Sequence, residues 1–238
     1  MPALRLHPVE RRTLADRVHE ELRHGLMVGR FLPGETLSLR TLSEAMGTSV
    51  MPIREAVTRL ASDNCLEVLP RRGIRVPALT LARFDEVWRL RALIEGEAAA
   101  LAAERASPAD LAVIAEHSAL AADALGPPVR PLAVIEHTKA MLFAIYTAAR
   151  TETMLPLIEM LWTRCGPHRM VPFHTPDRAA LAFLRHSCGH HDRLLAALHA
   201  RDGAAAGRIR AEDIAELAAF LRTRLMFTDQ AEPHRAAG

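Results

Sequence analysis

Residues 41–60, TLSEAMGTSVMPIREAVTRL, constrain the fold of this chain most, because two short helical patterns meet there at a single glycine. The first pattern ends at Gly47, since glycine readily adopts the left-handed backbone that follows a helix. The second begins after Ser49, a favoured N-cap residue, and Pro52 falls in its first turn, where the missing N–H costs nothing. Two such helices have the dimensions of a helix-turn-helix, whose second helix fits the major groove of DNA.

The segments on either side add further elements in a definite order. Residues 13–28 carry apolar side chains at helical spacing, and GRFLPGE then breaks that helix with two glycines and a proline. The run TLSL at 36–39 is extended. Beyond residue 60, CLEVLP and GIRVPAL are extended runs that flank RRG, which predicts a β-hairpin with its tip at residues 71–73. The predicted order is therefore three helices followed by a two-stranded wing.

Arginine side chains supply the chemistry for DNA binding in this region. Residues 1–80 contain 12 arginines against 9 acidic residues, a balance of +3, while the whole chain carries only +2. Arg54 and Arg59 lie on the second helix of the motif, and a guanidinium fork suits guanine edges or phosphates. Arg71 and Arg72, at the hairpin tip, are placed to reach the DNA backbone or the minor groove. Each arginine alone is also typical of a solvated helix face, but the order of elements favours DNA.

The rest of the chain carries helical patterns and no strand candidate. From Phe84 to about Arg224 we expect six helices, with a long loop from Gly166 to Pro176. The sequence PALT ends the wing and marks the domain boundary. We therefore predict a mainly α protein, with a winged helix-turn-helix over residues 1–79 and an all-helical bundle over residues 80–238 that ends in a disordered tail.

Composition and motifs exclude several classes of protein. The chain has no run of about 18 uncharged apolar residues, and its amino terminus, MPALRLHPVERR, lacks the apolar block of a signal peptide. We therefore expect a cytoplasmic protein with no membrane partner. Cys65, Cys165 and Cys188 are an odd number of cysteines with no C-x-x-C, which gives neither a disulfide framework nor a zinc knuckle. No nucleophile elbow, phosphate loop or zinc-protease motif is present, which argues against an enzyme.

The first domain resembles a known family of DNA-binding modules. The sequence GETLSLRTLSEAMGTSVMPIREAVTRLASDNCLEVLPRRGIRVP is similar to the winged helix-turn-helix of the GntR transcriptional regulators, and the resemblance covers residues 11–79. It implies DNA contacts by three residues: Arg40, Ser49 and Arg54. The family usually has arginine and threonine ahead of the proline of the third helix, where this chain has Val50 and Met51. One DNA contact is thereby lost, so we expect a different operator sequence or affinity.

The second domain resembles the FCD domain of the FadR branch. The sequence FDEVWRLRALIEGEAAALAAERAS carries this resemblance, which extends in weaker motifs from residue 84 to about 225. It implies an all-α bundle that binds a small effector and dimerises. We therefore expect a homodimeric regulator, a repressor, that binds two-fold related operator half-sites in double-stranded DNA and responds to a small molecule such as an organic acid.

Effector candidates follow from residue type within the bundle. They are Arg91, His137, His191, Asp213 and Arg164. Arg91 is equally suited to neutralise Glu95 or Glu97 inside the bundle. Two other functions remain open, namely a metal-dependent or small-molecule enzyme built on the bundle and a constitutive DNA binder that needs no effector.

The resemblance also implies a position for a divalent metal ion. Many FCD domains hold one with an aspartate and a histidine one helical turn apart and two later histidines. Here Thr138 and Leu142 occupy the first two positions, while His191 is retained and Asp213 replaces the last histidine. We therefore expect no cofactor. The alternative is zinc, nickel or manganese held by His191 and Asp213, with substitute ligands from three histidines: His137, His186 and His190.

Overall fold

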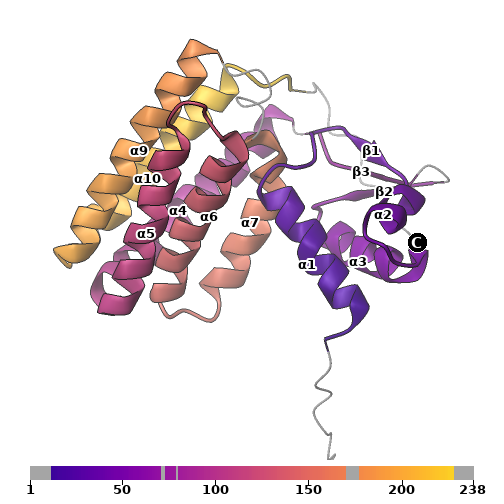
Figure 1. Ribbon diagram of the computed structural model, residues 1–238, viewed down its shortest axis with the longest axis horizontal. Coiled ribbons are helices and arrows are strands. Elements are labelled where there is room, and N and C mark those ends of the chain that lie inside the picture. The colour runs from indigo at the N-terminus through magenta and orange to yellow at the C-terminus, as the bar shows by residue number, and fades with distance from the viewer. Residues whose placement is uncertain (1–11, 71–72, 79, 170–176, 228–238) are drawn as a thin grey trace, which may run out of the picture.

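The computed structural model describes residues 12–70, 73–78, 80–169 and 177–227. In this part of the chain, three helices and a small sheet come first, and six helices then form a bundle (Figure 1). The predicted fold class, a winged helix-turn-helix followed by an all-helical bundle, is confirmed. The predicted disordered tail falls largely on residues 228–238, which lie outside the described residues.

Three helices build the first domain, and each begins at a hydroxyl-bearing N-cap residue. They are α1 (Leu14–Met27), α2 (Leu39–Ala45) and α3 (Val50–Ser62). Thr13 caps α1 in a capping box with Asp16, and the Ser38 side chain caps α2. Ser49 is the N-cap of α3 as predicted, and Gly47, at φ +60°, makes the turn before it. The predicted helix-turn-helix is therefore present as α2 and α3 (Figure 1).

A three-stranded antiparallel sheet completes this domain. Its strands are β1 (Thr36–Leu37), β2 (Glu67–Leu69) and β3 (Gly73–Arg75), in the order β1-β3-β2. The sequence predicted a two-stranded wing, and the structure adds the extended run before α2, because Leu37 pairs with Ile74. Glycine at position 73 permits this pairing, since a Cβ there would lie 2.3 Å from the Leu37 carbonyl oxygen.

The bundle packs six described helices around one main apolar core. They are α4 (Leu81–Arg105), α5 (Pro108–Ala124), α6 (Pro131–Ala148), α7 (Met154–Arg169), α9 (Arg178–His199) and α10 (Gly203–Arg222). The core includes Ile114, Met141, Leu142, Ile145 and Trp162. α4 and α10 cross closely at Gly96 and Gly207, because a Cβ on either glycine would lie 3.1 Å from the other's carbonyl oxygen. α4 begins slightly ahead of the predicted start at Phe84.

The predicted loop from Gly166 to Pro176 is wrong in its first part, because α7 continues to Arg169. Glycine and proline are poor helix residues, and together they predicted a break. In the structure residues 165–169 are all buried, so packing against neighbouring elements outweighs the local preference. The rest of that predicted loop, residues 170–176, lies outside the described residues.

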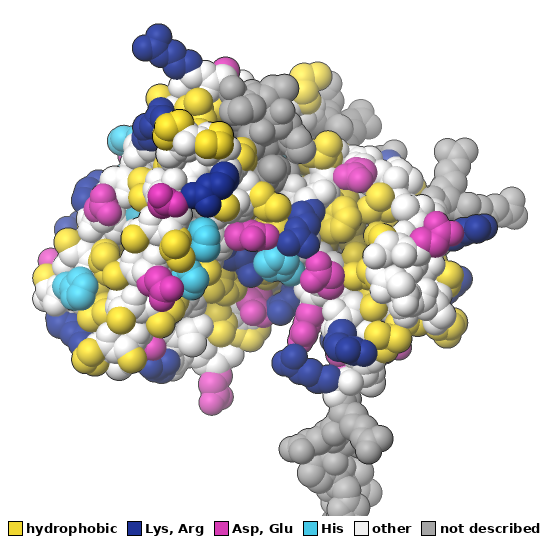
Figure 2. All heavy atoms as spheres, in the orientation of Figure 1, with side chains coloured by type: hydrophobic (Ala, Val, Ile, Leu, Met, Phe, Trp, Pro, Cys, Tyr) yellow, Lys and Arg dark blue, Asp and Glu magenta, His cyan; other side chains and the backbone are white. Residues whose placement is uncertain are grey.

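The two domains meet where α1 lies against α7, a contact we call the seam (Figure 1). A Cβ at Gly166 would lie 1.9 Å from the carbonyl oxygen of Leu26, so the two backbones touch. An ion pair between Arg23 and Glu159 crosses the same contact. Figure 2 shows basic and acidic side chains interleaved along this boundary. The seam therefore combines a direct backbone contact with charge pairing.

Replacing Gly166 with alanine tests the seam. The added methyl group cannot share space with the Leu26 carbonyl, so α1 must move away from α7. We expect the free energy of unfolding to fall by about 1–3 kcal/mol, measured by thermal or denaturant unfolding. Gly189→Ala in α9 is the matched control, because its Cβ meets nothing within 4 Å. That variant should gain up to about 1 kcal/mol. Equal stability of Gly166→Ala and the wild type would contradict the close contact.

Candidate functional site

The exposed face of α3 and the start of α2 form the candidate DNA surface. α3 packs into the domain core through four buried side chains: Ile53, Ala56, Val57 and Leu60. Arg40, Ser49 and Arg54 are all exposed. The Ser49 hydroxyl makes no capping hydrogen bond, and within the described chain Arg54 forms no ion pair, so both are available to DNA. Arg40 pairs with Glu44 one turn along its own helix at 2.8 Å, and that pair is largely solvated.

Arg59 differs from these residues because its guanidinium is paired with a carboxylate on another helix. Its Nη1 lies 2.7 Å from a carboxylate oxygen of Asp16 in α1. The hydrogen bond from the Thr13 backbone N–H, together with Arg59, lowers the pKa of Asp16 to about 2. Arg59 therefore joins α3 to α1 through one guanidinium nitrogen, and its other donors remain available to DNA because the side chain is 46% exposed. The predicted contacts of Arg71 and Arg72 lie outside the described residues.

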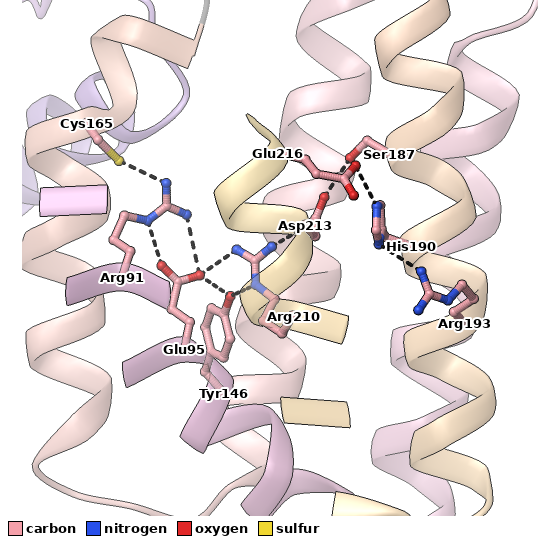
Figure 3. A network of polar contacts seen from close by, with 10 residues as sticks. All are labelled: Arg91, Glu95, Tyr146, Cys165, Ser187, His190, Arg193, Arg210, Asp213 and Glu216. Atoms are coloured by element: carbon pink, nitrogen blue, oxygen red, sulfur yellow. Dashed lines mark hydrogen bonds and ion pairs between the residues drawn. The ribbon is translucent and has the colours of Figure 1, made fainter. Parts of the chain in front are cut away.

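A buried network of charges crosses the bundle between α4, α6 and α10 (Figure 3). Arg91 donates to Glu95 at 2.6 Å, and Arg210 donates to the other oxygen of Glu95 at 2.5 Å. Arg210 also donates to the Tyr146 hydroxyl at 2.8 Å and pairs with Asp213. All five side chains are buried. Arg91 thus neutralises Glu95, which the sequence left open as the alternative to an effector contact, and Asp213 is occupied as well.

The network is electrically balanced, with two guanidinium groups against two carboxylates. Burial opposes the ionisation of Glu95, but the charges of Arg91 and Arg210 outweigh it and lower its pKa to about 2. Burial raises the pKa of the Tyr146 hydroxyl, which therefore stays neutral. A balanced and hydrogen-bonded network of this kind holds helices in register, and removing one partner leaves an uncompensated buried charge.

A cavity lies among α6, the end of α7, α9 and α10. Its apolar lining consists of Val134, Ile135, Phe183, Leu184, Leu217 and Phe220. Polar side chains also line it: Thr138, Arg169, Ser187 and His191. The cavity has a volume of ≈ 40 Å³, which is enough for roughly three water molecules. Ser187 links this cavity to the buried network by donating to Asp213 at 3.0 Å.

Arg169 and His191 bring unpaired polar atoms to the cavity. Arg169 is buried with its guanidinium carbon 4.2 Å from the Trp162 ring centroid, and its Nη1 has no hydrogen-bond partner among the described residues. Burial lowers its pKa to about 10, so it remains a cation at neutral pH. Both ring nitrogens of the buried His191 are likewise unpaired in the described chain, and burial lowers its pKa. Buried polar groups are nearly always hydrogen-bonded, so these atoms are ones that a ligand would satisfy.

The other predicted effector residues lie apart from the cavity. His137 stacks against His117, with 5.7 Å between ring centroids, and does not line it. Arg164 donates to the carbonyl oxygen of Asp63 at 2.9 Å, across the domain boundary. Arg169 was missed by the sequence analysis because its segment was assigned to a loop. No local signal marks it, since its burial depends on where four helices converge.

The metal site implied by the family resemblance does not fit these residues. Thr138 and His191 line the cavity, but Leu142 is buried in the core and offers no ligand atom. Asp213 is already paired with Arg210. These positions therefore provide no cage for a divalent ion.

Comparison with known protein families agrees with this description. Residues 14–76 match the family model "Bacterial regulatory proteins, gntR family", and residues 86–223 match the FCD domain. The chain therefore belongs to the GntR family of regulators, in the FadR-like branch that carries an FCD domain. It is a DNA-binding transcriptional regulator and not an enzyme.

Several known regulators are similar to this chain over part or most of its length. The chain is 34% identical over 194 residues to the HTH-type transcriptional regulator McbR of Escherichia coli K12, which covers 80% of this chain and 84% of McbR. It is 31% identical over 144 residues to Mce2R of Mycobacterium tuberculosis, covering 52% and 60% of the two chains. The solved structure of E. coli McbR/YncC superposes with a TM-score of 0.83 at 31% identity, over 90% of this chain and 99% of that one. A putative GntR regulator from Rhodococcus sp. RHA1, at 22% identity and a TM-score of 0.70, shares the fold.

No helix in the described part of the chain is long and apolar enough to span a membrane.

Replacing Glu95 with glutamine tests the buried network. The variant leaves Arg91 and Arg210 with a single carboxylate, and we expect it to lose about 3–5 kcal/mol of unfolding free energy. Glu97→Gln, exposed on the same helix, is the matched control and should change stability by no more than about 0.5 kcal/mol. The charge of Glu95 stabilises the wild type above the ordinary pKa of 4.5, and this contribution is lost as pH falls toward about 2. A fully stable Glu95→Gln variant would show that the network carries little stability.

Replacing Arg54 with alanine tests the DNA surface. We expect operator binding to weaken by about 1–3 kcal/mol, with an unchanged melting curve, because this exposed arginine is not needed for folding. Mobility shift on DNA selected by the wild-type protein gives the measurement. Arg208→Ala, which removes an exposed arginine of α10, is the control and should leave affinity unchanged. Wild-type affinity in Arg54→Ala would remove this residue from the interface.

Proposed function

We propose that this regulator is a homodimeric repressor whose affinity for its operator is controlled by an organic acid bound at Arg169 and His191. The observation that carries the proposal is a buried arginine that lines a cavity and, among the described residues, has no carboxylate partner. The other buried arginines of the bundle, Arg91 and Arg210, are both paired with acids. Among these three buried arginines, Arg169 is therefore the one whose charge an anionic ligand would neutralise.

The chemistry of the cavity favours one class of ligand. A guanidinium binds a carboxylate through two parallel hydrogen bonds, and such charge-assisted bonds are stronger than neutral ones. His191 adds a second polar contact, which suits a hydroxyl or the second oxygen of the acid. The apolar side chains opposite favour a hydrocarbon portion over a strongly hydrated one. A small carboxylic acid with a short apolar part meets these conditions.

The seam offers a route from this cavity to DNA. Arg169 is the last residue of α7, and Gly166, one turn earlier, touches α1 at Leu26. α1 is in turn tied to α3 by the pair between Asp16 and Arg59. An acid that draws the last turn of α7 toward the cavity therefore shifts α1 and the recognition helix with it. In a dimer this shift changes the distance between the two recognition helices. Operator binding depends on that distance, because the two half-sites lie at a fixed spacing along the DNA.

Replacing Arg169 with methionine separates an effector role from a structural one. The variant removes a buried, unpaired charge, so the free protein should melt at a higher temperature than the wild type. In the wild type, one of a panel of short carboxylic acids should raise the melting temperature and change operator affinity by about 5-fold to 150-fold. Both responses should vanish in Arg169→Met and persist in the exposed control Arg208→Met.

Two results would contradict the proposal. The first is a destabilised Arg169→Met protein that still responds to the acid, since Arg169 would then serve packing alone. The second is a wild-type protein whose operator affinity no acid of the panel alters. The repressor role has its own test, because transcription in vitro from an operator-bearing promoter should fall when the protein is added.

A further inference from the structure

Two histidines and a glutamate meet on α9 and α10, outside the cavity. His186 and His190 are one helical turn apart, so their side chains lie on the same face of α9. Their Nε2 atoms lie 2.8 Å and 3.0 Å from the same carboxylate oxygen of Glu216 on α10. The three ligand atoms lie within 4.8 Å of one another. Figure 3 shows the contact of His190 with Glu216.

We propose that His186, His190 and Glu216 form a binding site for a divalent transition-metal ion of the zinc type. Two imidazole nitrogens and one carboxylate oxygen are a known zinc donor set, in which solvent or another ligand fills the fourth position. The donor types also favour a transition metal over calcium or magnesium, which prefer oxygen ligands alone. The sequence led us to expect no metal, and the approach of Glu216 from a second helix changes that expectation.

Two of the three ligand separations lie close to those around a bound zinc ion, and the third, between the two histidine nitrogens, is within 4.8 Å and must close toward that spacing. Zinc binds nitrogen and oxygen ligands at about 2.0–2.2 Å, so tetrahedral ligand atoms lie roughly 3.3 Å apart. The distances from Glu216 to the two histidines are 2.8 Å and 3.0 Å, so they must open by only a few tenths of an ångström. His186 is 63% exposed and Glu216 46% exposed, while His190 is 5% exposed. The ion can therefore enter from the solvent side and bind the buried imidazole of His190.

Metal binding also requires the two histidines to carry their ring proton on Nδ1. A neutral histidine binds a metal through the lone pair of Nε2 and keeps its proton on Nδ1. For His190 this turns Nδ1 into a donor, which gives up its weak 3.5 Å contact with Arg193. Arg193 retains its ion pair with Glu212 at 3.3 Å. Metal binding also replaces the hydrogen bonds of both Nε2 atoms with Glu216, so the bonds to the ion must offset these two contacts and one long one.

This site differs from the one implied by the family resemblance. That arrangement would use His191 and Asp213, whereas here the ligands are His190 and its partner one turn back, His186. An ion bound there would cross-link α9 and α10. Both helices line the cavity through residues next to the ligands, among them Ser187 and Leu217. The site is therefore placed to stiffen one wall of the cavity, although its existence does not depend on the effector.

Zinc titration of tag-free, chelator-treated protein tests the proposal. Calorimetry should show one saturable zinc ion per chain, and zinc should raise the melting temperature until chelator reverses it. His186→Ala and Glu216→Gln should each weaken binding at least about tenfold, because even partners outside the ligand shell change metal affinity by 10-fold to 100-fold. Neither replaced side chain is buried, so the variants should fold.

Two matched histidine variants control the test. His199→Ala removes an exposed histidine at the end of the same helix, and His191→Ala removes the cavity histidine. Both should bind zinc as the wild type does. The proposal is overturned if the wild type shows no saturable binding or if His186→Ala and Glu216→Gln bind like the wild type. Loss of binding in His191→Ala with retention in His186→Ala would overturn it as well, by placing the ion in the cavity.

Discussion

The contact between the backbones of α1 and α7 fixes the DNA-binding domain on the bundle. The space for a side chain at Gly166 is occupied by the carbonyl of Leu26, so the two helices cannot approach this closely with any larger residue. The same contact keeps α7 helical through a glycine and a proline, and carries the helix to Arg169. The position of that arginine, and hence the character of the cavity, therefore depends on an interaction with the other domain.

Buried charges in the bundle fall into two groups with different consequences. Arg91 and Arg210 share Glu95 and Asp213 in a balanced network, in which every charge has an opposite neighbour. Such a network stabilises one arrangement of helices and leaves no group free to bind a ligand. Within the described part of the chain, Arg169 packs against the ring face of Trp162 and has no carboxylate partner. A buried cation without an opposite charge destabilises the folded state. Proteins retain costly groups of this kind where function requires them, and an anion in the cavity would offset that cost.

Local features were predictable from the sequence, whereas convergence of distant segments was not. Gly47 and Ser49 predicted the helix-turn-helix, because turn and cap preferences act over a few residues. Arg91 and Glu95 lie one turn apart, so their pairing was foreseeable as well. The third strand, the full length of α7, and the place of Arg169 depend on tertiary packing, which overrides local propensity. The same distinction applies to the candidate metal site, where the two histidines share a helix but Glu216 comes from another.

The affinity of the effector acid for the free protein and for the operator-bound protein tests most directly whether the cavity and the DNA surface are coupled. If the seam transmits the effect, the ratio of these two affinities must equal the ratio of operator affinities measured with and without saturating acid, because coupling between two sites is reciprocal. We expect a ratio of about 5-fold or more, reduced toward one when Gly166→Ala loosens the contact of α1 with α7. An acid that binds equally well in the presence and absence of operator would contradict this coupling.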